Sequence, residues 1–235
     1  MSAWKPKRFW KTATAEVCEG GFTVRLDGRA VKTPAKSAFV LPTLVMAQAA
    51  AAEWDAQVKE VHPETMPVTR MANSAIDKVA VQFDEVAGLL AAYGESDLLC
   101  YRAAGPAGLV ARQAAAWDPL LDWAASALAA PMVATAGVVH VAQPPGSIAA
   151  LRARLFALSP FRLAAMHDLI SIPGSLILGF AVAQHRLTAA EAFSISRIDE
   201  QWQAEKWGED EEASALEALK RAALAEAARF WDLCG

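Results

Sequence analysis

The stretch Phe22-Thr-Val-Arg-Leu-Asp-Gly-Arg-Ala-Val-Lys-Thr33 decides the fold of this chain. Apolar and polar residues alternate over Phe22–Leu26, and the Asp-Gly pair that follows is typical of the two-residue turn of a β-hairpin. The flanking segments 9–17 and 38–41 also contain residues that favour strands. The sequence therefore predicts a small antiparallel sheet of three or four strands near the start of the chain.

A helical pattern replaces the strand pattern after Pro42. Thr43 is a suitable N-cap for a helix over residues 44–60, which we expect to cover one face of the sheet. A proline-containing connection follows and places a domain boundary near residue 70. The predicted fold class is therefore α+β, with a small sheet-and-helix domain over residues 1–70 and a mostly α-helical domain over residues 71–235.

Helical periodicity dominates the second part of the chain. The predicted helices cover residues 71–83, 84–93, 107–130, 147–158, 160–172, 175–186, 188–207 and 210–233, and only residues 132–141 look like a strand. Thr188 and Glu191 form a capping box at the start of the 188–207 helix, and Gly208 is a stop signal at its end. One apolar face of the last helix is formed by Leu216, Leu219, Ala223, Ala227 and Phe230.

Charge and composition exclude several classes of partner. The 235 residues carry a net charge of -4 with a pI near 5.6, so we expect no nucleic-acid partner, although residues 1–36 are locally basic. The longest strongly apolar stretch, 169–183, falls short of the roughly 20 residues that span a bilayer, so we expect no stable membrane insertion. The N-terminus carries no signal-peptide pattern, and three widely spaced cysteines indicate a reducing compartment.

The common signatures of a catalytic site are missing from the sequence. It contains no phosphate-binding loop of the GxxxxGK[ST] or GxGxxG type and no GxSxG elbow. The four histidines are far apart and lack the spacing of metal ligands, and Cys100 lies between apolar neighbours, as an inert buried thiol does. We therefore expect a protein that is not an enzyme, with no catalytic residue, no metal and no cofactor.

An acidic run over Asp199–Glu212 holds seven carboxylates against the single base Lys206. Two interpretations stay open: a solvated acidic helix end, and a surface that binds a partner. Tryptophans within the run favour a partner surface, because aromatic residues amid charge are typical of recognition, although Trp202 continues an apolar helical face. The candidate partner-binding residues are Asp199, Glu200, Gln203, Glu205, Trp207, Glu209 and Asp210.

Several segments of the chain resemble one known family. They are Leu26–Lys36, Glu53–Asp55, Thr65–Thr69, Asp97–Arg102, Trp117–Trp123, Gly174–Leu176, Ser196–Asp199 and Trp207–Ala213. In this order they resemble the F1-ATPase alpha-subunit assembly chaperones, the ATP synthase F1 complex assembly factor 2 family. An enzyme with a cryptic pocket and a different binding or scaffolding module are the alternatives.

The resemblance implies an ATP-independent chaperone that binds the unassembled alpha subunit of F-type ATP synthase and prevents its aggregation until it pairs with the beta subunit. It also implies a bacterial member that acts in the cytoplasm, and we expect a monomer. Within the family segments, Trp54, Trp117 and Trp123 lie on apolar helices and are expected to be structural. Asp97 and Arg102 are expected to form a buried or interdomain pair.

Overall fold

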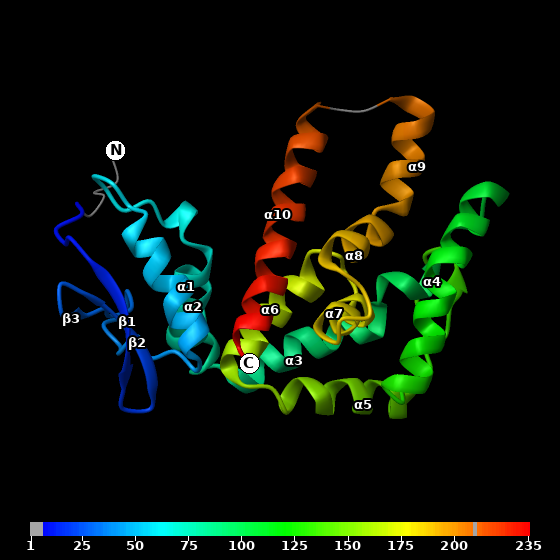
Figure 1. Cartoon of the computed structure of the whole chain (residues 1–235). Coiled ribbons are helices and arrows are strands. Elements are labelled where there is room, and N and C mark those ends of the chain that lie inside the picture. The colour runs from blue at the N-terminus through cyan, green and yellow to red at the C-terminus, as the bar shows by residue number, and fades with distance from the viewer. Residues whose placement is uncertain (1–6, 209–210) are drawn as a thin grey trace. The chain divides into compact units, whose positions relative to one another are not determined.

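A β-hairpin and the helix that covers it form the N-terminal part of the computed structural model, which describes residues 7–208 and 211–235 (Figure 1). Strands β1 (Ala13–Cys18), β2 (Gly21–Leu26) and β3 (Arg29–Ala30) make an antiparallel sheet in the order β1-β2-β3. Asp27 and Gly28 have φ angles of 48° and 82°, as a two-residue hairpin turn requires. The predicted sheet is therefore confirmed with three strands, while residues 38 and 41 form only isolated bridges.

Helix α1 (Leu44–Asp55) packs on this sheet. Its Thr43 cap is confirmed, because the hydroxyl of Thr43 accepts a hydrogen bond from the backbone N–H of Met46. Small residues such as Ala47 and Ala50 are fully buried and let the helix approach the sheet closely. The helix ends five residues before the predicted position, where the guanidinium of Arg8 donates to the backbone carbonyls of Asp55 and Gln57.

The chain is divided into two compact units that differ from the two predicted domains. Unit 1 contains the residues up to Phe83 together with Ser159–Ala165 and Arg229–Gly235, and unit 2 contains Asp84–Leu158 and Met166–Ala228. The first break thus follows residue 83, whereas the predicted boundary is near residue 70. Unit 1 also contains two segments from much later in the sequence.

Those later segments complete the core of unit 1. Phe230 is fully buried in the cluster that also holds the sheet residue Val24, and its ring stacks on Phe161 with centroids 6.4 Å apart. The hydroxyl of Thr43, at the start of α1, donates to the backbone carbonyl of Leu233 over 2.6 Å. The end of the chain is therefore an integral part of the N-terminal unit.

Family segments in unit 1 are held together by two partly exposed carboxylates, those of Glu53 and Asp77. Glu53 of α1 accepts hydrogen bonds from the backbone N–H groups of Val68 and Thr69, which begin helix α2 (Pro67–Ser74). Burial raises the pKa of Glu53, although these hydrogen bonds oppose the rise. A π-helical turn (Ala75–Val79) follows α2, and its Asp77 binds Thr33 and Ala35 in the loop after the hairpin.

Unit 2 is helical, as predicted, and it surrounds the fully buried helix α7 (Leu176–Ala183). The other helices assigned wholly or largely to it are α3 (Phe83–Ala91), α4 (Ala107–Ala127), α5 (Pro145–Phe156), α8 (Ala189–Ser196), α9 (Ile198–Trp207) and α10 (Glu211–Leu233), while α6 (Pro160–Ser171) is divided equally between the two units. Two very short strands, β4 (Tyr101–Arg102) and β5 (Thr135–Ala136), pair in parallel. No helix within residues 7–208 and 211–235 is long and apolar enough to cross a membrane.

The predicted pairing of Asp97 with Arg102 is wrong. The buried carboxylate of Asp97 accepts hydrogen bonds from the Ser175 hydroxyl (2.7 Å) and from the backbone N–H groups of Leu99 and Ile177 (both 3.0 Å). It therefore joins a short 3₁₀ turn (Leu98–Cys100) to the start of α7. Arg102 instead pairs with Asp118 at 2.8 Å, because the helical neighbour of Arg102 is α4.

Two features of the C-terminal helices also differ from expectation. The predicted 188–207 helix is broken at Arg197, whose guanidinium donates to the backbone carbonyl of Ile172, although the capping box and the stop at Gly208 are confirmed. The apolar face of α10 is buried only in its second half, since Leu216 and Leu219 are 52% and 69% exposed.

Candidate partner-binding surface

Helix α9 carries most of the predicted partner-binding residues and packs on α4 within unit 2. Four residues of α4 supply the attachment, as two pairs whose members are four residues apart: Gly108 with Arg112, and Gln113 with Trp117. Residues at these spacings lie on one face of a helix, so α4 presents a single surface to α9 and its neighbour α8. In Figure 1, α9 and the first half of α10 extend away from α7 and α8.

Asp199 contacts a buried side chain of its own protein. Its carboxylate accepts a hydrogen bond of 2.5 Å from the amide nitrogen of Gln113, which is fully buried. The amide oxygen of Gln113 in turn accepts from the backbone N–H of Ala103 over 2.8 Å. Asp199 therefore completes a polar network that ties α9 to α4 and to the segment before α4.

Glu205 is also engaged within unit 2. Its two carboxylate oxygens accept hydrogen bonds of 2.7 and 2.9 Å from the guanidinium of Arg112, and this contact lowers the pKa of Glu205. The same guanidinium lies 5.0 Å from the ring of Trp202, which Lys206 approaches at 5.2 Å. The ion pair with Glu205 holds the exposed guanidinium of Arg112 over the ring of Trp202 and so orients α9 on α4. Because the pair is exposed to solvent, it contributes little to the free energy of unfolding.

Trp202 has a structural role: it packs within the protein, as its place on an apolar helical face indicated, rather than forming part of a partner surface. Its ring packs on Gly108 so closely that a Cβ atom there would lie 2.8 Å from a ring carbon. A side chain larger than hydrogen at position 108 would have to displace the indole. A glycine early in α4 is therefore required for the approach of α9.

Three of the remaining predicted residues are exposed. Glu200 pairs with Arg197 at 2.8 Å on the same turn of helix, while the side chain of Gln203 faces solvent. Trp207 is 80% exposed, which is unusual for the largest apolar side chain. Glu209 and Asp210 lie outside the described residues.

The roles of Arg112 and Gln113 and the exposure of Leu216 and Leu219 were not predicted from the sequence. A basic residue and an amide on a predicted helix carry no signal of their own, because their partners lie more than 80 residues away in the sequence. Leu216 and Leu219 were recognised as one apolar face, but periodicity alone cannot tell a face that packs on a core from one that faces solvent.

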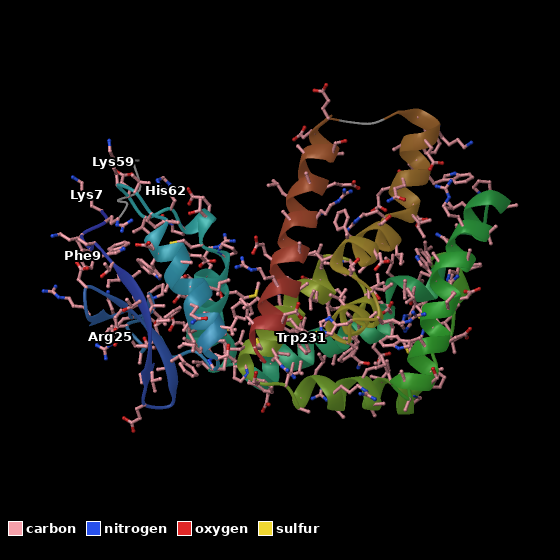
Figure 2. All side chains as sticks on the ribbon, viewed as in Figure 1. Lys7, Phe9, Arg25, Lys59, His62 and Trp231 are labelled. Atoms are coloured by element: carbon pink, nitrogen blue, oxygen red, sulfur yellow. The ribbon has the colours of Figure 1, made fainter. Side chains whose placement is uncertain are left out.

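Groups that could support other chemistry are scattered. The prediction of an inert thiol at Cys100 is confirmed, because burial raises its pKa to about 12. Within residues 7–208 and 211–235, no three His, Cys, Asp or Glu side chains are placed to hold a metal ion. Unit 1 has an open cavity of about 460 Å³ lined partly by Lys59 and His62, on the surface where Figure 2 also shows Lys7 and Phe9.

Comparisons with known proteins agree on one relationship. The family model of the ATP12 chaperone protein matches residues 7–125. The crystal structure of Atp12 from Paracoccus denitrificans is 51% identical, covers 99% of this chain and 100% of its own, and superposes with a TM-score of 0.97. A crystal structure of a candidate chaperone from Agrobacterium tumefaciens is 44% identical, covering 98% and 87% of the two chains, with a TM-score of 0.93. The mitochondrial protein atp12 of Schizosaccharomyces pombe is 25% identical over 223 residues, which are 90% of this chain and 77% of that protein.

Proposed function

This chain belongs to the ATP12 chaperone family, and from that membership we propose that it binds the unassembled alpha subunit of F-type ATP synthase and prevents its aggregation until the beta subunit takes its place. Membership in a chaperone family, rather than an enzyme family, agrees with the prediction made from the missing catalytic motifs. The observation that carries the proposal is the 51% identity to Paracoccus denitrificans Atp12 over almost the entire length of both chains. A cytoplasmic site of action and a monomeric state are parts of the same proposal.

We place the contact with the alpha subunit on the outer surface of α9. Of the residues predicted to bind, Asp199 and Glu205 hold α9 in position, and Gln203 and Trp207 offer exposed side chains. An exposed tryptophan is costly in water and is the residue type most enriched among energetic centres of protein interfaces. The carboxylates around it favour a partner surface that carries lysine or arginine. Glu209 and Asp210 remain candidates by sequence alone.

The proposed activity is tested by warming purified alpha subunit with increasing amounts of the protein. We expect aggregation, followed by light scattering, to fall in proportion to the added protein until the two are equimolar, with or without ATP. Size exclusion should then give a complex of one copy of each chain. Protection by a small catalytic amount, or a requirement for ATP, would contradict a binding chaperone.

The same assay locates the surface through Trp207→Ser. Because Trp207 is 80% exposed, this variant should melt at the wild-type temperature, while its affinity for the alpha subunit should fall by about tenfold or more, as for a central aromatic contact. A Phe9→Ser variant, which removes another exposed aromatic residue, is the matched control in unit 1. If both variants bound the alpha subunit as tightly as wild type, Trp207 would not be part of the contact.

A further inference from the structure

The first half of α10 has an exposed apolar face that the fold does not use. Leu216 and Leu219 are 52% and 69% exposed, and every residue over 211–222 except Glu217 is classed as exposed. Spacing of three residues puts both leucines on the same side of the helix, and we call this pair the α10 face. It continues the row that is buried further along the helix at Ala227 and Phe230.

Leu216 and Leu219 contribute little to the stability of the free protein, because their side chains stay in contact with water. Exposed apolar side chains forgo the burial that is worth about 1.5–3 kcal/mol for a leucine in a core. Their neighbours Ala215, Ala218 and Ala222 are small, so the two leucines project from a smooth helical surface. A pair of leucines at helical spacing on such a surface is the pattern by which a helix inserts into an apolar groove of another protein.

We propose that the α10 face docks in an apolar groove of the unassembled alpha subunit, one that is rimmed by lysine or arginine. This inference rests on the proposed function and adds to it the residues that supply apolar contact. The basic rim follows from charge: the exposed half of α10 carries Glu211, Glu212 and Glu217 against Lys220, and its other base, Arg221, lies over the ring of Phe193 at 5.1 Å, within unit 2. The groove must be exposed before the alpha subunit is assembled, which is when a chaperone is needed.

A second copy of this chain is a poorer occupant of the same face. The twelve positions of 211–222, of which eleven are exposed, extend over about 18 Å of helix, and a face of that length with a width of about 10 Å falls far below the roughly 800 Å² per partner of a stable interface. A client can add contacts from the neighbouring helix α9, where Trp207 and Gln203 are exposed. The α10 face therefore fits one part of a larger client interface.

The test compares full-length wild type with the double variant Leu216→Gln/Leu219→Gln. Glutamine has nearly the helix propensity of leucine, so α10 should persist, and circular dichroism and melting temperature should not change. The matched control is Leu89→Gln, which replaces a leucine that is 64% exposed on α3 of the same unit. The Kd for purified alpha subunit should rise by at least about tenfold in the double variant, since burying two leucines is worth more than that factor, and should stay unchanged in the control.

The outcomes separate this inference from the proposed function. If wild type captures the alpha subunit and the folded double variant captures it equally well, the docking role of the α10 face is wrong and the proposed function stands. If wild type captures none, the proposed function fails and the inference fails with it. Sedimentation of each protein alone covers the remaining case: a wild-type dimer that the double variant converts to monomer would assign the face to self-association and overturn the inference.

Discussion

At the scale of single residues, the segments that resemble the family are mainly architectural. Glu53 caps α2, Asp97 joins a 3₁₀ turn to α7, and Trp117 donates its indole N–H to the backbone carbonyl of Ile195 over 3.0 Å. The structural role of Trp117 was expected from its apolar helix and agrees with its burial, but the partners of Glu53 and Asp97 were not predictable, because a motif does not tell which way a side chain points. The error over Asp97 has the same origin, since its actual partner Ser175 lies 78 residues away.

Asp97→Asn should destabilise the protein although it changes one atom. The new amide group would set an N–H against the backbone N–H of Ile177, leaving a buried donor without an acceptor at a cost of about 1–3 kcal/mol. Burial raises the pKa of Asp97, and hydrogen bonds from Ile177 and Ser175 offset only part of that rise. The ionised form of this buried carboxyl is therefore stabilised mainly by these hydrogen-bond donors. Urea unfolding at neutral pH measures the loss.

The control for that prediction is Asp118→Asn. Asp118 pairs with Arg102 but its side chain is 59% exposed, so its loss should change the free energy of unfolding little. Equal effects of the two substitutions would mean that the buried hydrogen bonds of Asp97 contribute no more than a surface ion pair.

At the scale of elements, helix positions were predictable and helix breaks were not. The capping box of Thr188 and Glu191 is local chemistry and is present as predicted. The break at Arg197 depends on the backbone carbonyl of Ile172, which no local pattern reveals. The acidic run was identified from the sequence as a candidate surface. The side chains that bind Asp199 and Glu205 come from α4, and the spacing of residues in the sequence does not reveal such contacts between distant helices.

The attachment of α9 predicts different results for two charge reversals. Asp199→Lys would leave the buried amide of Gln113 without its acceptor and should lower stability by about 1–3 kcal/mol, whereas Glu205→Lys breaks an exposed pair and should change stability little. Hydrogen exchange should show faster opening of α9 amides in the Asp199 variant. Asp199→Asn keeps an acceptor for Gln113 and serves as its control.

The contrary result is equally informative. An Asp199→Lys variant that melts like wild type and protects α9 amides normally, yet fails to capture the alpha subunit, would show that Asp199 contacts the client directly. Its hydrogen bond to Gln113 would then be dispensable for the fold.

At the scale of the whole molecule, the composition of the two units was the least predictable feature. An α+β start followed by helices was predicted correctly from the hairpin turn and the helical periodicity. The assignment of Ser159–Ala165 and Arg229–Gly235 to the sheet-containing unit has no counterpart in the sequence, because both segments continue ordinary helical patterns. Only tertiary packing distinguishes the buried Phe230 from the exposed Leu219 on the same helix.

Phe230→Ala should therefore weaken the N-terminal sheet from the far end of the chain. Truncating a fully buried phenylalanine costs about 3–5 kcal/mol, and here the loss falls on the cluster that holds Val24 of β2. Hydrogen exchange of β1 and β2 amides should accelerate in this variant. Leu219→Ala, on the exposed half of α10, is the control and should leave β1 and β2 as protected as in wild type; acceleration in both would indicate a general loss of the fold.

The membership of Phe230 in the core of unit 1 also has a consequence for how the protein is made on the ribosome. The residues between Leu41 and Phe230 take roughly 10–40 s to synthesise at about 5–20 residues per second. During most of that interval the hairpin and α1 have been synthesised but lack the aromatic side chain that completes their core. This unit therefore reaches its native packing only late in translation, and until then a chaperone's own nascent chain is itself a candidate for protection.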